Sequence, residues 1–336
     1  MPDSGDDLVE PHDPVQPDRV LTVSDTGPSL DDVLAAREAI GGRLHRTPTF
    51  SSATLGERVF LKAELFQKTG SFKPRGVLTN LAALSPEERE RGVIGISAGN
   101  HAQALAWGAA TEGVDALLVM WQGASTAKIE ATRGYGAEVD LEAGDPTEAF
   151  ERLAELQEQT GRALVHPFDH PLTIAGQGTV GLEIVEDVPE ATTIVVPVGG
   201  GGLISGIAVA AQGRRVIGVE PELSPAMHEA LAAGKPVPVS PHSIADGLAA
   251  PFAGEHGLAI CRELVEQIVL VSEDELKDAM RLLYTRAKLA AEPAAAAGVA
   301  ALMGGKVPLE PEETLVVVVS GGNVATETTV AILAGE

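Results

Sequence analysis

The chain has a single cysteine, Cys261, among its 336 residues. One thiol cannot form an internal disulfide bond and offers no thiol cluster to a zinc ion, which suggests a reducing compartment. No apolar run approaches the ~18 residues of a membrane-spanning helix, and the N-terminus lacks the basic-then-apolar pattern of a signal peptide. We therefore expect a cytoplasmic protein with no membrane partner.

Basic and aromatic residues are also scarce. The sequence has 24 Lys and Arg against 48 Asp and Glu, a net charge of −24 at pH 7, and only 3% aromatic residues. A polyanion repels nucleic-acid phosphates and anionic membranes, and so few aromatic side chains cannot line a groove that stacks bases. We expect no nucleic-acid partner. The charge itself indicates solubility, or a salt-rich cytoplasm, rather than an acid-specific function.

Residues 1–28 are rich in Pro, Asp and Ser, and this composition cannot bury enough apolar surface to offset the entropy of ordering. It predicts an acidic, disordered tail. Ordered structure is expected from about Ser29, which can cap a helix through DDVLAAREAIGG, because the early acidic residues of that segment suit the positive end of the helix dipole.

Short apolar runs alternate with segments of helical composition along the rest of the chain. This alternation predicts an α/β fold with mostly parallel sheets flanked by helices. Nine strand-like runs are many for one sheet, so we expect two lobes: a large one of residues 29–80 plus 171–336, and a small inserted one of residues 81–170. The runs cover residues 59–65, 92–97, 115–121, 137–143, 163–168, 193–199, 215–221, 267–272 and 314–322.

In such folds, ligands bind beyond the carboxyl ends of strands, and four strand ends here carry unusual residues. The first segment runs from Glu64 to Gly76 and contains GSFKPRG. Pro74 fits the first position of a helix, so Lys73 would lie at a helix N-terminus, where the dipole lowers the pKa of an amine as a Schiff-base lysine requires. A surface lysine in a loop is the alternative for this segment alone.

The second segment is SAGNHAQ, residues 97–103. Its small residues let backbone N–H groups approach an anion such as a carboxylate, and Asn100 adds a directed polar contact. His101 is a candidate general base, although a lone histidine in such a place is more often a structural hydrogen-bond partner.

The third segment is PVGGGGLISG, residues 197–206. Four consecutive glycines cost backbone entropy and make sense where the backbone wraps a ligand closely, with N–H groups and a helix dipole forming a phosphate cradle. The loop lacks the GK[ST] of a nucleotide P-loop but is close to the dinucleotide fingerprint, and Glu220 ends the next strand, where a ribose-binding acid is expected. A dehydrogenase and a phosphate-ester cofactor both remain open for this segment.

The fourth segment is SGGN, residues 320–323, at the end of TLVVVVS, whose continuous apolar character predicts a central strand buried on both faces. A hydroxyl followed by two glycines can contact a ligand ring, or the segment can be a plain turn. Together, a lysine at a helix start, an anion-binding turn, a phosphate cradle and a terminal hydroxyl match the needs of pyridoxal phosphate.

With these motifs in this order, the chain resembles the fold type II pyridoxal-phosphate enzymes, in the threonine/serine dehydratase branch that includes serine racemase relatives. The resemblance runs from about residue 29 to the C-terminus. It implies the tryptophan synthase β-like fold, a large lobe that binds the cofactor, an amino-acid substrate and a homodimer or higher homo-oligomer. The matching segments are GSFKPRG, SAGNHAQALA, HPFDHPLTIAGQGT, PVGGGGLISG, GVEPE, IADGL, AEPAAAAG and SGGN.

The resemblance also implies a role for each site residue. Lys73 would carry the internal aldimine and remove the α-proton of the substrate. The cofactor would be bound by Phe72 against the ring, Asn100 at the 3-hydroxyl, the backbone amides of Gly199, Gly200, Gly201, Gly202 and Leu203 at the phosphate, and Ser320 at the pyridine nitrogen. The turn formed by Ser97, Ala98, Gly99 and His101 would receive the substrate carboxylate.

Two positions favour a particular reaction within this branch. Ser320 protonates a pyridine less strongly than a carboxylate would, so the ring is a weaker electron sink, and elimination is favoured over transamination. Racemases of this branch carry a serine where this chain has Ala98. A methyl group cannot deliver a proton, which argues for a dehydratase.

A cation site is less clearly indicated. Racemases of this branch commonly bind a divalent cation through an acid that corresponds to Glu220 and a second acid six residues later, where this chain has Ala226. One carboxylate is a poor Mg²⁺ site, so Glu220 is only a weak candidate metal ligand, and a monovalent cation, or none, is as much expected as a divalent one.

The implied reaction is dehydration and deamination of a β-hydroxy amino acid: L-threonine to 2-oxobutanoate and ammonia, or L-serine to pyruvate and ammonia. Serine racemase and 3-hydroxyaspartate dehydratase are alternatives in the same family. Alternatives of other classes are an NAD-dependent dehydrogenase built on the GGGG loop and Glu220, which leaves Lys73 and Ser320 unexplained, and a non-catalytic binding protein, which does not need a desolvated amine.

Overall fold

The computed structural model of the protein describes residues 27–211, 213–307, 310 and 312–335. The predicted disordered tail, residues 1–28, lies outside these residues except for Gly27 and Pro28. The first helix, α1 (Leu30–Ile40), begins as predicted at Ser29. The Ser29 side chain accepts a hydrogen bond from the backbone of Asp32, and the Asp32 side chain accepts one from the backbone of Ser29, so the two form a capping box.

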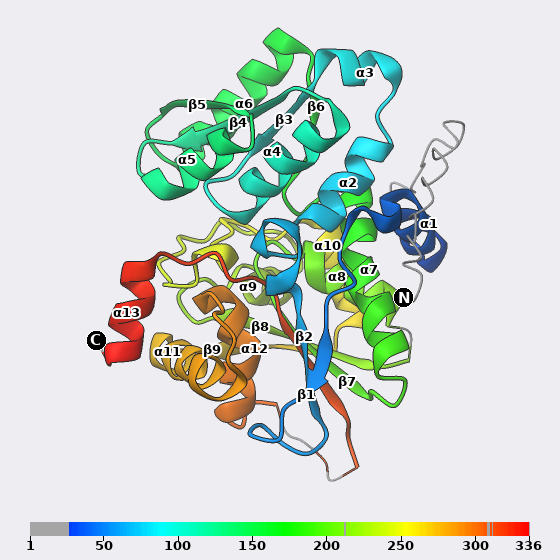
Figure 1. The fold of residues 1–336 in the computed structure, drawn as a ribbon, viewed down its shortest axis with the longest axis vertical. Helices are drawn as coiled ribbons and strands as arrows, with labels where there is room; N and C mark the ends of the chain where they lie inside the picture. Colours follow the sequence, from blue (N-terminus) through cyan, green and yellow to red (C-terminus); the bar gives the residue numbers. More distant parts are fainter. Residues whose placement is uncertain (1–26, 212, 308–309, 311, 336) are drawn as a thin grey trace, which may run out of the picture.

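The described residues form two sheets, one above the other in Figure 1. The larger sheet has the strand order β1-β2-β10-β7-β8-β9, and β1 is antiparallel to β2 while the other strands are parallel. The smaller sheet is entirely parallel, in the order β5-β4-β3-β6. The strands are β1 (Thr49–Ser51), β2 (Val59–Ala63), β3 (Val93–Ile96), β4 (Ala116–Trp121), β5 (Glu138–Ala143), β6 (Ala163–Leu164), β7 (Thr193–Pro197), β8 (Arg215–Pro221), β9 (Gln267–Val271) and β10 (Leu315–Val319).

Helices connect and cover these strands, as the predicted α/β fold requires. After α1 they are α2 (Pro74–Ala82), α3 (Pro86–Arg91), α4 (Asn100–Glu112), α5 (Thr126–Gly134), α6 (Pro146–Thr160), α7 (Pro171–Asp187), α8 (Gly202–Ala210), α9 (Ala226–Ala233), α10 (Glu255–Leu264), α11 (Glu273–Leu282), α12 (Pro293–Met303) and α13 (Thr326–Ala334). No helix in the described part of the chain combines the length and apolar character needed to cross a bilayer.

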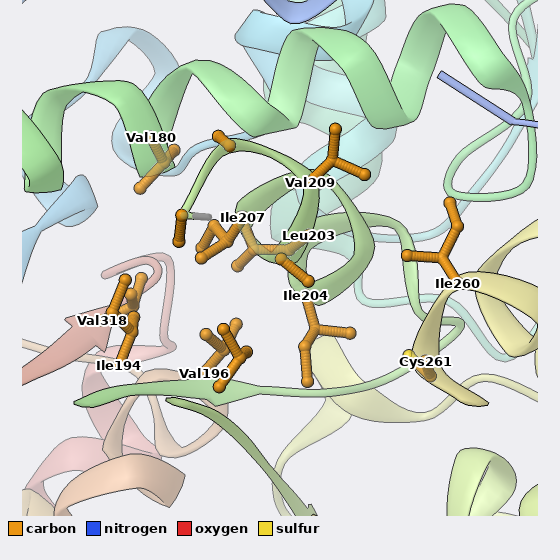
Figure 2. Close-up of a cluster of buried hydrophobic side chains, with 14 of the residues drawn as sticks. Val180, Ile194, Val196, Leu203, Ile204, Ile207, Val209, Ile260, Cys261 and Val318 are labelled. Carbon is orange, nitrogen blue, oxygen red and sulfur yellow. The ribbon is translucent and has the colours of Figure 1, made fainter. Parts of the chain in front are cut away.

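Strand β10 is central, as its continuous apolar run predicts, and all five of its residues are buried. Alternate side chains enter different cores, because neighbouring residues of a strand point to opposite faces. Val316 and Val318 belong to one buried cluster with residues of α7 and α8, and Figure 2 shows Val318 beside Ile194 of β7 in this cluster. Val317 packs on the other face, against the alanine-rich helix α12.

The smaller sheet is likewise covered on both faces. Leu118 of β4 packs with α4 and α2, and Val119 packs with α6. Helix α2 contacts both α4 and α7, so it lies at the junction of the two halves of the molecule (Figure 1).

All nine predicted strands are present, and the predicted fold class is confirmed. The prediction missed β1, a three-residue antiparallel strand at the edge of the larger sheet. Strands β3 to β6 fall within residues 81–170, and the other six fall outside that range. The domain limits themselves stay a prediction.

Candidate active site

Lys73 immediately precedes α2, so the predicted helix start at Pro74 is confirmed. The Nζ atom of Lys73 donates a hydrogen bond to the carbonyl oxygen of Pro167, 2.9 Å away, and lies 5.1 Å from the centroid of the Phe72 ring. Burial disfavours the charged ammonium and lowers the pKa of Lys73 to about 8, while the negative charge of Glu292 acts in the opposite direction. An amine that is partly neutral near pH 7 to 8 is suited to nucleophilic and proton-transfer chemistry.

Ser320 follows the last residue of β10 and is buried. Its carbonyl oxygen accepts a hydrogen bond of 3.2 Å from the backbone N–H of Phe72, and Gly321 forms a bridge with Ser71. The first and fourth segments of the sequence therefore lie side by side, and the Ser320 main chain is directly beside that of Phe72 and Lys73.

Asn100 is the first residue of α4, and its side chain joins the second segment to the fourth. Its Nδ2 atom donates to Oε1 of Glu292 at 2.8 Å, and its Oδ1 atom accepts a hydrogen bond of 2.8 Å from Nδ2 of Asn323. The amide of Asn100 is thus held from both ends, close to the strand end that carries Ser320.

Glu292 is a site residue that the sequence analysis did not assign. It precedes α12 and is 3% exposed, and burial is the largest cause that raises its carboxyl pKa to about 7. Asp246 raises this pKa further, whereas the hydrogen bond from Asn100 and the charges of Lys128 and Lys73 lower it. The sequence did contain one signal for this residue: Glu292 is the single charged residue of AEPAAAAG, at the start of an otherwise apolar helix.

The four-glycine loop connects β7 to α8, and Phe168 packs against it. A Cβ atom on Gly200 would lie 2.3 Å from the Phe168 ring, and one on Gly202 would lie 2.7 Å from the Phe168 carbonyl oxygen. Gly201 has φ +99°, a left-handed conformation that favours glycine. Packing against Phe168 therefore requires glycine at positions 200 and 202.

The N-terminus of α8 offers backbone N–H groups that suit an anion. Gly201 is the N-cap residue and no side chain caps the helix, so the dipole and the first N–H groups are not satisfied by a side chain. Leu203 is buried in the core beneath the loop (Figure 2), so its contribution to ligand binding would come from its backbone N–H.

The turn at residues 97–101 is partly exposed except for His101. The backbone N–H of Gly99 donates to Oγ of Ser97 at 3.0 Å. The ring of His101 points into the protein, with Nε2 2.9 Å from the carbonyl oxygen of Val165. Burial, the nearby charge of Lys73 and that of His166 lower the pKa of His101 to about 3, although the Val165 contact opposes this. Its imidazole is a neutral structural partner, which leaves its backbone N–H for ligand binding.

Glu220 is the last residue but one of β8, close to the predicted strand end, and its carboxyl group caps a helix. Its two oxygen atoms accept hydrogen bonds of 2.8 Å from the backbone N–H groups of Met227 and His228 at the start of α9. Burial raises the pKa of Glu220 to about 8. Within the described ranges no group of three or more His, Cys, Asp or Glu could hold a metal ion. Cation binding at Glu220 stays a prediction.

Residues 40–321 match the family model described as pyridoxal-phosphate dependent enzyme. The chain belongs to this family. The resemblance noted from the motifs is confirmed, and the predicted cofactor is pyridoxal phosphate rather than a nicotinamide.

Three relatives of this pyridoxal-phosphate dependent enzyme indicate its branch of the family. It is 43% identical over 305 residues to the L-threonine ammonia-lyase of Thermotoga maritima, covering 88% of this chain and 76% of that protein. It is 40% identical over 310 residues to the catabolic L-threonine dehydratase of Escherichia coli, covering 88% of this chain and 93% of that protein. A solved maize serine racemase is 36% identical with a TM-score of 0.86, covering 91% of this chain and 97% of that one.

The residues that the fold brings together fit pyridoxal phosphate. A phosphate needs N–H donors and positive potential, and the uncapped, glycine-lined start of α8 supplies both. An aldehyde needs a neutral amine, and Lys73 has a lowered pKa. A substituted pyridine ring offers polar atoms at its edge, and Ser320 and Asn100 belong to the two segments that contact the segment of Lys73.

Proposed function

We propose that this enzyme is an ammonia-lyase that dehydrates and deaminates L-threonine to 2-oxobutanoate and ammonia, and L-serine to pyruvate and ammonia. The observation that carries the proposal is the partly buried Lys73 amine, in a segment that contacts the segments of Ser320 and Asn100, in a chain 43% identical to an L-threonine ammonia-lyase. Both substrates are α-amino acids with a hydroxyl group on the β-carbon, which is the leaving group in the proposed elimination.

Lys73 would both hold the cofactor and move the α-proton. Pyridoxal phosphate, when bound, supplies an electron sink for the negative charge that develops at the α-carbon of the substrate. With its pKa near 8, the Lys73 amine is neutral in a substantial fraction of molecules and can accept a proton at Nζ. The carbonyl oxygen of Pro167 orients that nitrogen through the 2.9 Å hydrogen bond.

The other residues of the site would bind and orient. The backbone N–H groups of residues 199–203 would hold the phosphate at the start of α8, Phe72 would lie against the ring, and Asn100 would face its 3-oxygen. Ser320 would donate to the pyridine nitrogen. A hydroxyl is a weaker acid than a carboxyl, so the ring would take up less of the negative charge from the α-carbon. Transamination needs that charge to be spread over the ring, whereas elimination can expel the β-hydroxyl instead, so this contact favours elimination.

The substrate carboxylate would meet the start of α4. Ser97, Ala98, Gly99 and His101 surround Asn100 there, and no side chain caps this helix. The helix dipole and the backbone N–H groups of this turn favour an anion. Because the His101 ring is turned toward Val165, its side chain takes no part in this binding.

Serine racemisation is the second candidate, favoured by the 36% identity to the maize serine racemase. Racemisation needs a proton donor on the face of the cofactor opposite Lys73. The family pattern puts that donor at position 98, where this chain has alanine. This difference supports the dehydratase.

We also propose that the protein works as a homodimer or a higher homo-oligomer in a reducing cytoplasm. The family resemblance supports the oligomer, and the single buried cysteine supports the compartment.

A panel of β-hydroxy amino acids tests the proposed function. The purified enzyme with pyridoxal phosphate is given L-threonine, L-serine, 3-hydroxyaspartate and phenylserine, and 2-oxo acid and ammonia are measured together. We expect equal amounts of both products from L-threonine and L-serine, and none from D-threonine or from Lys73→Ala. Failure to release either product from both L-threonine and L-serine would overturn the proposal.

A further inference from the structure

A chain of hydrogen bonds crosses the candidate site from Thr69 to Glu292. Nδ2 of Asn323 donates to the carbonyl oxygen of Thr69 at 2.7 Å and to Oδ1 of Asn100 at 2.8 Å. Nδ2 of Asn100 then donates to Oε1 of Glu292 at 2.8 Å. The four residues come from four separate segments, so this arrangement exists only in the folded protein.

The direction of this chain is fixed from the Thr69 end. The carbonyl of Thr69 only accepts hydrogen bonds, so Asn323 must turn its nitrogen toward it. Oδ1 of Asn323 then lies over Gly70, where a Cβ atom would approach it to 2.5 Å. Nδ2 of Asn323 also donates to Oδ1 of Asn100, so a flipped Asn100 amide would set two N–H donors against each other.

The amide of Asn100 is therefore left with one N–H group. Its oxygen is taken by Asn323 and its first N–H by Glu292, and no other described residue accepts a hydrogen bond from Nδ2. A donor facing the 3-oxygen of the cofactor ring stabilises the ionised form of that oxygen, because a hydrogen bond to the charged form favours it.

We propose that Glu292 and Asn323 are positioning residues, which lock the amide of Asn100 so that its remaining N–H group serves the 3-oxygen of pyridoxal phosphate. This inference rests on the proposed role of Asn100 in the function above. We call the hydrogen bonds that Glu292 and Asn323 make with Asn100 the lock. The inference predicts that the lock determines what fraction of the bound cofactor has an ionised 3-oxygen, the form that absorbs at ~410–420 nm.

Charge around Glu292 has to be separated from hydrogen bonding in the test. Lys73, at the start of α2, and Lys128, on α5, face Glu292 with positive charge, and Asp246 faces it with negative charge. Glu292→Gln and Glu292→Leu both remove the negative charge, but only glutamine keeps an oxygen that accepts from Asn100. Asn323→Leu breaks the other end of the lock and changes no charge.

The measurement is the visible spectrum of the holoenzyme at fixed pH, together with the cofactor dissociation constant. For Glu292→Leu and Asn323→Leu we expect a smaller share of the ~410–420 nm band and a dissociation constant raised about fivefold or more, since one hydrogen bond of the lock is lost. We expect Glu292→Gln to keep the wild-type band. Glu275→Leu is the matched control: this carboxylate pairs with Lys306 in the part of the protein around α11, and its loss should leave the band unchanged.

Two results would overturn the inference. One is a wild-type spectrum and cofactor affinity in both Glu292→Leu and Asn323→Leu; if Glu292→Leu does not fold, Asn323→Leu alone decides. The other is an equal loss of the band in Glu292→Gln and Glu292→Leu, which would assign the effect to charge. If the wild-type enzyme binds the cofactor through Lys73 and turns over, but the variants change neither the band nor the dissociation constant, only this inference is contradicted. A wild-type enzyme without the band contradicts the proposed function itself.

Discussion

Lys128 on α5 forms a salt bridge with Asp246, which lies in a short 3-10 helix (Asp246–Leu248) on the side of the molecule that contains the larger sheet. A second contact joins the same two sides: the rings of Phe150 on α6 and Phe252 are 5.6 Å apart between centroids. The charges of Lys128 and Asp246 also act on the carboxyl group of Glu292. The salt bridge that joins the two sides of the molecule therefore also influences the pKa of a site residue.

The Lys128 salt bridge should add a small, salt-sensitive stability. Lys128→Met and Asp246→Asn should each lower the free energy of unfolding, and the double variant should be no less stable than either single variant. The coupling free energy should be about 0.2–1 kcal/mol at low ionic strength, because Asp246 is well exposed. The coupling should disappear in high salt. A double-mutant cycle of urea unfolding measures it, with Arg133→Met, whose partner Glu130 lies on the same helix, as the control. Losses that simply add at low salt would contradict the prediction.

The lowered pKa of Lys73 predicts how the apoenzyme captures its cofactor. Only the neutral amine attacks an aldehyde, and the neutral fraction rises with pH until the pKa, about 8, is passed. The rate of cofactor incorporation should therefore rise up to about pH 8 and then level off. Stopped-flow absorbance at a series of pH values measures it. A rate that keeps rising to pH 10, as an ordinary lysine would produce, contradicts this prediction.

Gly200→Ala should weaken cofactor binding strongly. Its Cβ atom would lie 2.3 Å from the Phe168 ring, so the phosphate loop has to move or Phe168 has to leave its place. We expect the dissociation constant of the cofactor to rise at least about tenfold, with a loss of about 1–3 kcal/mol in the free energy of unfolding.

Gly134→Ala is the matched control for Gly200→Ala. No atom lies within 4 Å of a Cβ at position 134, and the helical position favours alanine, so stability should not fall. Combining Gly200→Ala with Phe168→Ala should restore part of the cofactor affinity. If Gly200→Ala binds the cofactor as tightly as the wild type, the loop geometry described above is wrong.

Ala98→Ser tests why the enzyme eliminates rather than racemises. The serine hydroxyl would supply the proton donor that the methyl group of Ala98 lacks, so L-serine should give measurable D-serine, with a racemisation rate at least about tenfold above that of the wild type. Ala98→Gly, which changes the side chain without adding a hydroxyl, should not gain this activity. Chiral chromatography of the product measures both. Equal D-serine formation in the serine and glycine variants would contradict the assignment.

The sequence predicted the larger part of the fold because its strands are distinctive. A run such as the one that forms β10 is apolar at every position, which only a strand buried on both faces needs. Strand β1 was missed because three residues at a sheet edge carry no such pattern. The meeting of Lys73 with Ser320 was predictable in outline, because the carboxyl ends of parallel strands share one edge of a sheet.

The parts of the site that depend on tertiary contacts could not be predicted. Neither the packing of Phe168 on Gly200 nor the hydrogen bond from Asn100 to Glu292 leaves a trace in local spacing. His101 carried a chemically suggestive side chain, but whether its ring faces a ligand or Val165 is decided by the fold. Glu220 was predicted at the right strand end, while its use as a helix cap depends on α9.

The covalent link to Lys73 is the central claim, and borohydride reduction tests it most directly. The holoenzyme is reduced, digested and mapped by mass spectrometry, with Lys73→Ala as the control. The account predicts that the reduced cofactor is found on the peptide that contains Lys73 and on no peptide of the variant. A label on another lysine, or no label in the wild-type enzyme, would contradict it.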